Sequence, residues 1–209
     1  MKPSISKLLA TSLLLLGCVG ILTAQNASVD DTYRASEVDV PVKGTILIIT
    51  DNDYNDTELL YPYYRLVEAG YIVTIATPEG GDIAGYNTAP IKNTVPLERV
   101  DVSLFDGLYL PGGHAPAKLR ENKVVLEKVK HFLDENKPVA AICHGPQILA
   151  KMGVLTGKQV AAWPDLDEEM REAGATFVNH PVVKDGNLVT ARMPGDLPAH
   201  MHEFLSMLK

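Results

Sequence analysis

The segment that decides the fold reads Lys137-Pro-Val-Ala-Ala-Ile-Cys-His-Gly-Pro-Gln147. Its first half is a run of small and β-branched residues, typical of a strand buried on both faces of a parallel sheet. The run leads directly into Cys143-His144-Gly145, and a helical pattern resumes at Gln147. A buried strand that turns sharply into a helix indicates a nucleophile elbow with cysteine in place of serine. A position at a helix N-terminus predicts a lowered pKa for the Cys143 thiol.

Strands and helices alternate on both sides of this segment. Further strands are expected at 45–50, 71–76, 107–111 and 159–162, with a hairpin formed by 182–184 and 188–191. Helices are expected at 56–70, 123–136, 147–152, 165–173 and 201–208. This alternation predicts an α/β fold, a flavodoxin-like three-layer sandwich with a mostly parallel sheet.

The composition is that of an ordinary globular protein. The chain has 209 residues, of which 46% are hydrophobic and 22% charged, and this length suits one compact domain. A net charge of −7 presents no basic surface for nucleic acid. Two cysteines make no disulfide framework, and six scattered histidines beside them do not suggest a zinc module. We expect neither a metal nor a cofactor.

The N-terminus has the pattern of an export signal. Lys2 and Lys7 precede or border an apolar run at 8–22, and Leu22-Thr23-Ala24 resembles a small-residue cleavage site. We therefore expect a signal peptide at 1–24, a flexible leader at 25–42 and a single domain at 43–209, with a periplasmic or secreted destination. Alternatively, Leu15-Leu16-Gly17-Cys18 resembles a lipoprotein box, which would anchor the chain to a membrane through Cys18.

Three features are expected to meet at the carboxyl ends of the strands, where open α/β sheets bind ligands. They are the Cys143 elbow, the Leu110-Pro-Gly112-Gly113 turn, whose glycines let N–H groups approach an oxyanion, and Glu58 in the first turn of a helix. Taken singly, these features also fit a core cysteine, an ordinary turn and a solvated carboxylate. Their shared location favours an active site.

Several motifs resemble the PfpI/ThiJ family, which has a class-I glutamine-amidotransferase-like fold. They are Asp56-Thr-Glu-Leu-Leu-Tyr-Pro-Tyr-Tyr-Arg-Leu66, Leu110-Pro-Gly-Gly113, the Cys143 segment and Thr190-Ala-Arg-Met-Pro-Gly-Asp-Leu197. The resemblance extends from about residue 43 to the C-terminus. It implies a homo-oligomer, either a dimer or a hexamer.

The resemblance also implies roles for individual residues. Cys143 matches the family nucleophile, Glu58 the glutamate that touches the thiol, and His144 the histidine that follows the nucleophile. Gly113 and the His144 N–H match the oxyanion donors. Trp163 stands where relatives place a pocket aromatic residue.

The chain departs from the family pattern beside this site. Ala117 stands where protease-like relatives have a glutamate that orients a histidine, which weakens a proteolytic triad. Asn55 replaces an acidic residue. His114 is an addition beside the pocket and is either a second acid/base or a histidine on the rim. His180 lacks the nearby glutamate of glutamine amidotransferases, so glutamine hydrolysis is not expected.

The sequence is compatible with three functions. The first is a cofactor-free enzyme acting on a small aldehyde or a glycated protein, with Cys143 as nucleophile and Glu58 and His144 as acid/base. The second is a cysteine peptidase of the PfpI type. The third is a thiol redox sensor or chaperone in which Cys143 is oxidised.

Overall fold

The computed structural model describes residues 40–87 and 91–208. The predicted signal peptide at 1–24, its Cys18 and most of the predicted leader at 25–42 lie outside the described residues. The strands are β1 (Gly44–Ile49), β2 (Tyr71–Thr77), β3 (Gly81–Ile83), β4 (Ile91–Pro96), β5 (Gly107–Leu110), β6 (Val139–Ile142), β7 (Gln159–Val160), β8 (Thr176–Phe177), β9 (Val182–Asp185) and β10 (Leu188–Ala191). The helices are α2 (Asp56–Glu68), α3 (Ala115–Leu119), α4 (Lys123–Asp134), α5 (Pro146–Lys151), α6 (Asp167–Glu172) and α7 (Leu197–Met207), with 3₁₀ turns η1 (Leu97–Arg99), η2 (Val102–Leu104), η3 (Pro164–Leu166) and η4 (Pro194–Asp196).

Strand β6 lies inside an eight-stranded sheet, and all four of its residues are buried. The strand order is β3-β4-β2-β1-β5-β6-β10-β9. Strands β4, β2, β1, β5, β6 and β10 run parallel to one another, while β3 and β9 pair antiparallel at the two edges. Burial on both faces explains why the central strands read as continuous apolar runs.

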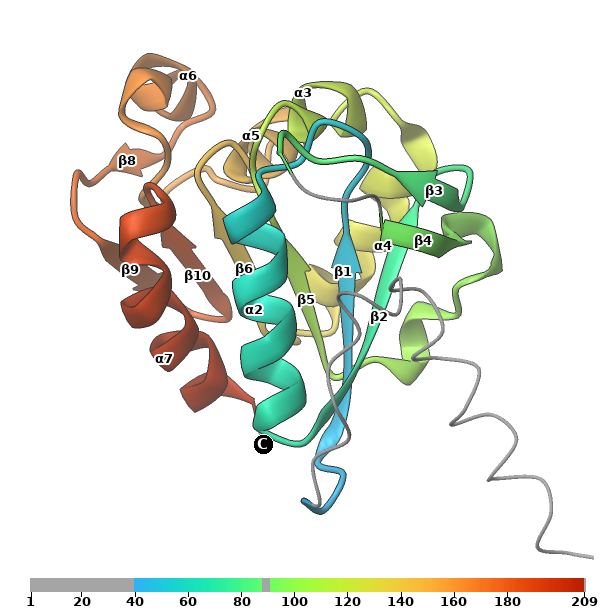
Figure 1. Cartoon of the computed structure of the whole chain (residues 1–209). Coiled ribbons are helices and arrows are strands. Elements are labelled where there is room, and N and C mark those ends of the chain that lie inside the picture. The colour runs from blue at the N-terminus through green and yellow to red at the C-terminus, as the bar shows by residue number, and fades with distance from the viewer. Residues whose placement is uncertain (1–39, 88–90, 209) are drawn as a thin grey trace, which may run out of the picture.

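Helices cover both faces of the sheet (Figure 1). Helices α2 and α7 pack on one face, over a core that includes Ile48, Tyr109 and Val189. Helices α4 and α5 pack on the other face, over a second core that includes Leu47 and Leu108. The predicted three-layer α/β sandwich with a mostly parallel sheet is confirmed. This arrangement places the carboxyl ends of β1, β5 and β6 side by side, because these strands are neighbours.

Several elements differ from the sequence prediction. Strands β3, β4 and β8 and helix α3 were not predicted, and the strand expected at 159–162 is only the two residues of β7, which pairs with β8 outside the main sheet. Strands β3 and β4 carry little apolar signal, and β4 contains Asn93 at φ +55°. Helix α7 begins four residues earlier than predicted, because its first turn accommodates Pro198.

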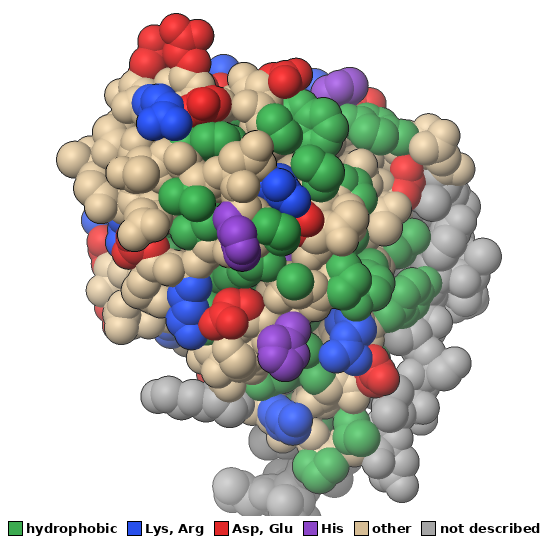
Figure 2. Space-filling model, turned by 90° about the vertical axis from the view of Figure 1, so that its left-hand side faces the viewer, with side chains coloured by type: hydrophobic (Ala, Val, Ile, Leu, Met, Phe, Trp, Pro, Cys, Tyr) green, Lys and Arg blue, Asp and Glu red, His purple; other side chains and the backbone are tan. Residues whose placement is uncertain are grey.

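Figure 2 looks onto the side of the molecule formed by α6, α7 and β9. Acidic and basic side chains gather at the top of this face, the height at which α6 lies, and this helix contributes Asp167, Glu168, Arg171 and Glu172. Within residues 40–87 and 91–208, no helix combines the length and hydropathy needed to cross a membrane.

Candidate active site

Cys143 stands on a strained turn at the end of β6. Its backbone φ is +60°, a left-handed conformation that residues with a side chain rarely adopt. The Cys143 N–H donates to the carbonyl of Ala191 at 3.0 Å, and its carbonyl accepts from the Trp163 N–H at 2.9 Å. A Cβ at Gly145 would lie 2.5 Å from the Leu110 carbonyl oxygen, so this position needs glycine. The turn therefore has the geometry of the expected elbow, with Cys143 only 5% exposed.

Glu58 enters the same site from the first turn of α2. The side chain of Asn55 caps this helix by accepting from the N–H groups of Thr57 at 3.1 Å and Glu58 at 3.3 Å. The Glu58 side chain is fully buried, and its Oε2 accepts from the Gly112 N–H at 2.9 Å. Burial raises the pKa of Glu58 to about 7, against the opposing effects of the Cys143 thiol and the Gly112 N–H. Glu58 is thus able to take or give a proton near neutral pH.

The pKa of the Cys143 thiol differs from the value expected for a cysteine at a helix N-terminus. Burial raises its pKa, and the neighbouring Glu58 carboxylate raises it further, while the N–H groups of Gly113 and His144 act in the opposite direction. The prediction of a lowered pKa was wrong in direction, because α5 starts only at Pro146 and the thiol is buried beside a carboxylate. An ionised Cys143 therefore requires a protonated Glu58 or a base that removes the proton.

His144 is positioned to act as that base. Its Nδ1 lies 3.2 Å from the Cys143 Sγ, and its ring stacks on Trp163 with centroids 6.0 Å apart and an interplanar angle of 20°. Burial lowers the pKa of His144 and the nearby His114 lowers it further, while Glu169 and Asp165 oppose this shift. His144 is therefore neutral at neutral pH and able to accept the thiol proton.

The two glycines after β5 form one wall of the site. A Cβ on Gly112 would lie 2.5 Å from Glu58 Oε2 and 2.8 Å from the Cβ of Cys143. Gly113 adopts φ +87°, and a Cβ there would lie 2.4 Å from the Asn55 nitrogen. Gly112 needs glycine because its backbone lies close to Glu58 and Cys143, and Gly113 needs it because of its positive φ and its approach to the backbone before α2.

The structure brings all seven predicted site residues to one end of the sheet, and it adds Tyr86. His114 is exposed on the rim, where its ring lies 5.1 Å from that of Tyr86 at an angle of 58°. Burial raises the pKa of Tyr86, and Cys143 and then Glu58 raise it further. Tyr86 belongs to a loop without a motif, so nothing in the sequence could have identified it.

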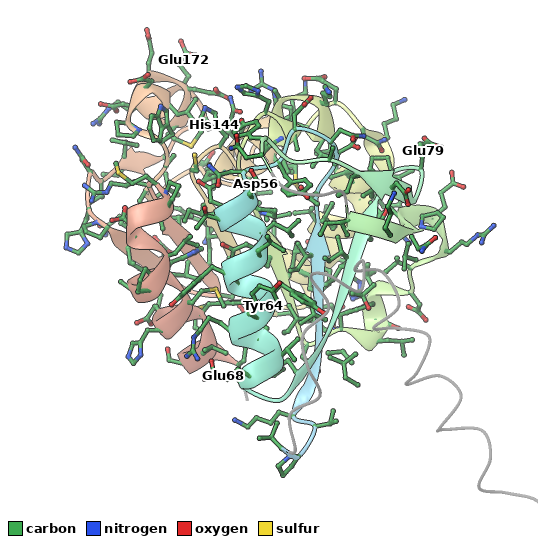
Figure 3. The ribbon with its side chains drawn as sticks, in the orientation of Figure 1. Asp56, Tyr64, Glu68, Glu79, His144 and Glu172 are labelled. Atoms are coloured by element: carbon green, nitrogen blue, oxygen red, sulfur yellow. The ribbon has the colours of Figure 1, made fainter. Side chains whose placement is uncertain are left out.

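Figure 3 shows how the ends of the elements converge. His144 lies beside the upper end of α2, where Asp56 marks the first residue of the helix, while Tyr64 and Glu68 lie progressively farther from the site. Ala117 is exposed on α3 and supplies no carboxylate. Among the described residues, no group of three or more His, Cys, Asp or Glu side chains is arranged to hold a metal ion.

The terminal motif of the resemblance forms a structural ion pair. Arg192 Nε donates to Asp196 Oδ2 at 2.9 Å, and Arg192 Nη2 donates to Oδ1 at 3.1 Å. Arg192 Nη1 also donates to the side chain of Asn179 at 2.8 Å. These bonds join the end of β10 to the start of α7.

Residues 44–207 match the family model described as the DJ-1/PfpI family. The chain belongs to the DJ-1/PfpI family. Among DJ-1/PfpI proteins, it is 43% identical over 164 residues to Deglycase PfpI of Pyrococcus furiosus, an alignment that covers 78% of this chain and 99% of the relative. It is 36% identical over 165 residues to YraA of Bacillus subtilis, which is provisionally named a cysteine protease, with coverage of 78% and 98%. The crystal structure of Drosophila melanogaster DJ-1beta superposes with a TM-score of 0.74 at 27% identity, covering 80% of this chain and 91% of that chain.

Proposed function

We propose that this DJ-1/PfpI protein is a cysteine-dependent enzyme, needing no cofactor, that acts on reactive carbonyl groups, as a glyoxalase or a protein deglycase. The observation that carries the proposal is a nucleophile flanked by two proton-transfer groups. Cys143 lies 3.2 Å from His144 Nδ1, and Glu58, beside the thiol, has a pKa of about 7. The deglycase name of the Pyrococcus furiosus relative supports the same class of substrate.

The chemistry follows from these groups. His144 or Glu58 takes the thiol proton, and the Cys143 sulfur attacks the aldehyde carbon of methylglyoxal to give a hemithioacetal. A proton then moves from the former aldehyde carbon to the neighbouring carbonyl carbon through Glu58 or His144, which oxidises the first carbon to a thioester and reduces the second to an alcohol. Water hydrolyses the thioester, releasing lactate and the thiol. The N–H groups of Gly113 and His144 favour the oxyanions formed on the way.

The first test compares the full chain with Cys143→Ala and with Cys18→Ala, which removes the other thiol. Methylglyoxal consumption and the formation of D- and L-lactate are measured, with buffer alone as a blank, because amines and thiols trap the aldehyde reversibly. We expect Cys143→Ala to lose lactate formation by at least about a thousandfold and Cys18→Ala to retain it. Aldehyde loss without lactate, or equal rates in Cys143→Ala, would refute the proposal.

A cysteine peptidase is the second candidate. The short Cys143–His144 contact and the provisional name of YraA favour it. The exposed Ala117 counts against it, because no carboxylate at that place orients His144. Cleavage of fluorogenic peptides that depends on Cys143, in the absence of lactate formation, would favour this candidate. Oxidation of Cys143 as the physiological role stays a prediction, which mass spectrometry of the purified protein tests.

We also propose a localisation, an oligomeric state and a restriction on partners for this protein. We propose export directed by residues 1–24, with lipid attachment at Cys18 as the alternative, and N-terminal sequencing of the exported protein distinguishes the two. We propose a homo-oligomer, which sedimentation measures. We propose no nucleic acid partner, because the net charge of −7 disfavours binding to phosphates.

A further inference from the structure

A group of buried polar atoms lies in the layer between the sheet and helices α2 and α7, beneath Cys143. The Tyr109 hydroxyl and the His200 Nδ1 are fully buried and have no hydrogen-bond partner among the described residues. Glu58 Oε1, also buried, meets no N–H or O–H donor there. A buried polar group without a partner destabilises the fold, so three such groups together call for an explanation.

These atoms belong to residues that pack in one core. The ring of Tyr109 on β5 lies 5.7 Å from that of His200 on α7 and 6.1 Å from that of Phe204. Tyr109 pairs in register with Ala140 of β6, three residues before Cys143. Gly112, which donates to Glu58, follows Tyr109 by the same three residues. Tyr109 therefore sits about 10 Å along the strands from Cys143 and Gly112, with its side chain in the layer that Glu58 enters.

The hydrogen-bonding roles of the three atoms are complementary. His200 Nε2 donates to the carbonyl oxygen of Val189 at 3.3 Å, which leaves Nδ1 as an acceptor. Burial lowers the pKa of His200 to about 4, so this neutral tautomer holds at neutral pH. Tyr109 offers an O–H donor, and the Glu58 carboxylate offers a second acceptor.

We propose that an internal water site joins Tyr109, His200 and Glu58, and that the two rings are positioning residues for the proton of Glu58. The water accepts from the Tyr109 O–H and donates to His200 Nδ1 and Glu58 Oε1. These three bonds are the usual number for a buried water and satisfy all three atoms at once. The added donor favours the Glu58 carboxylate, and a charged Glu58 keeps the remaining proton of the pair on the Cys143 thiol.

The ionisable groups around Tyr109, His200 and Glu58 agree with a water between these three residues. Burial raises the pKa of Tyr109, and the charges of Glu58 and then Cys143 raise it further. The other ionisable groups that act on the pair are Tyr86 and His144, and Asp196 of η4 faces His200. The inference rests on the proposed role of Glu58 in the site.

The first test is a crystal structure of the full chain at atomic resolution. We expect a water within hydrogen-bond distance of the Tyr109 hydroxyl, His200 Nδ1 and Glu58 Oε1. A dry site, or a direct bond between the Tyr109 hydroxyl and His200, overturns the proposal.

The second test measures the rate of Cys143 alkylation by iodoacetamide against pH, read by mass spectrometry of the peptide that contains Cys143. Tyr109→Phe is compared with Phe204→Leu, which alters the same core but removes no polar atom. We expect Tyr109→Phe to lower the midpoint of the profile by about half to one pH unit, a three- to tenfold gain in reactive anion below the midpoint, because a neutral Glu58 does not oppose the Cys143 anion. Phe204→Leu should leave the midpoint unchanged. An unchanged or raised midpoint in Tyr109→Phe, or an equal shift in both variants, overturns the proposal.

Alkylation needs no enzymatic turnover, so the result is independent of the reaction. Absence of lactate formation in the wild-type chain, together with a lowered midpoint in Tyr109→Phe, would remove the proposed function and leave the water site standing.

Discussion

Glu58 holds a carboxyl group where a charge is unfavourable. It is completely buried, and burial raises its pKa to about 7. A group whose pKa is raised on folding stabilises the fold below its unfolded pKa, and this stability is lost as pH rises through the folded pKa. This stabilisation is therefore lost between about pH 4.5 and about pH 7. Above this range, the fold carries a buried charge that the active site uses.

Replacing Glu58 by Gln separates function from stability. We expect Glu58→Gln to lose lactate formation, because an amide cannot carry the proton. Relative to wild type, its free energy of unfolding should rise between pH 4.5 and 7, by on the order of 1 to 3 kcal/mol above pH 7. Urea unfolding at several pH values measures this. Glu68→Gln, on the exposed end of the same helix, is the control. A pH-independent difference between Glu58→Gln and wild type would contradict the argument.

At the scale of elements, the site depends on how closely the turn after β5 approaches the elbow after β6. Gly112 is the point of closest approach, since a Cβ there would lie 2.5 Å from Glu58 Oε2. We expect Gly112→Ala to lower the free energy of unfolding by about 1 to 3 kcal/mol and to reduce activity about a hundredfold, because Glu58 and Cys143 must move apart.

Gly195→Ala is the matched control for this substitution. Gly195 is exposed in η4, and an added Cβ would meet nothing within 4 Å. Its stability should stay within about 0.5 kcal/mol of wild type. Equal effects of the two substitutions on thermal unfolding and activity would show that the contact at Gly112 is not limiting.

The elements that carry the site are also those that the sequence predicts well. Strands β1, β5 and β6 are buried on both faces, so their composition alone reveals them, and the Cys143 elbow follows from a strand that runs directly into small residues. Strand β3 lies at an edge and β4 lies next to it, where local pattern is weak and pairing decides the conformation. Tyr86 lies in the irregular segment after β3, where no sequence motif marks it as a site residue. The pKa of Cys143 also depended on burial beside Glu58, which no local pattern encodes.

At the scale of the whole molecule, two buried ionisable groups affect stability in opposite directions. His200 is fully buried on α7, and burial lowers its pKa to about 4 from 6.5. A histidine with a lowered folded pKa destabilises the fold as pH falls from 6.5 toward 4, because the unfolded chain binds the proton more tightly. Glu58 stabilises the fold over much of the same range as pH falls. The two effects offset each other in the wild-type chain.

A variant without His200 should show the pH dependence of stability that Glu58 produces alone. We expect His200→Phe to become more stable relative to wild type as pH falls from 6.5 to 4, by on the order of 2 to 3 kcal/mol at the acid end. His202→Gln, two residues along the same helix and exposed, should track wild type at every pH. Thermal unfolding between pH 4 and 8 distinguishes these profiles, and parallel curves for His200→Phe and wild type would contradict the assignment.

The N–H groups of Gly113 and His144 that lower the pKa of Cys143 belong to the backbone. Amides of this kind do not titrate, do not oxidise and are present in every side-chain variant. Stabilisation of negative charge at this place is therefore constant across pH and redox conditions. In any environment, the response of this site to pH and oxidation therefore resides in the ionisable side chains Glu58, Cys143 and His144, while the backbone donors around them stay the same.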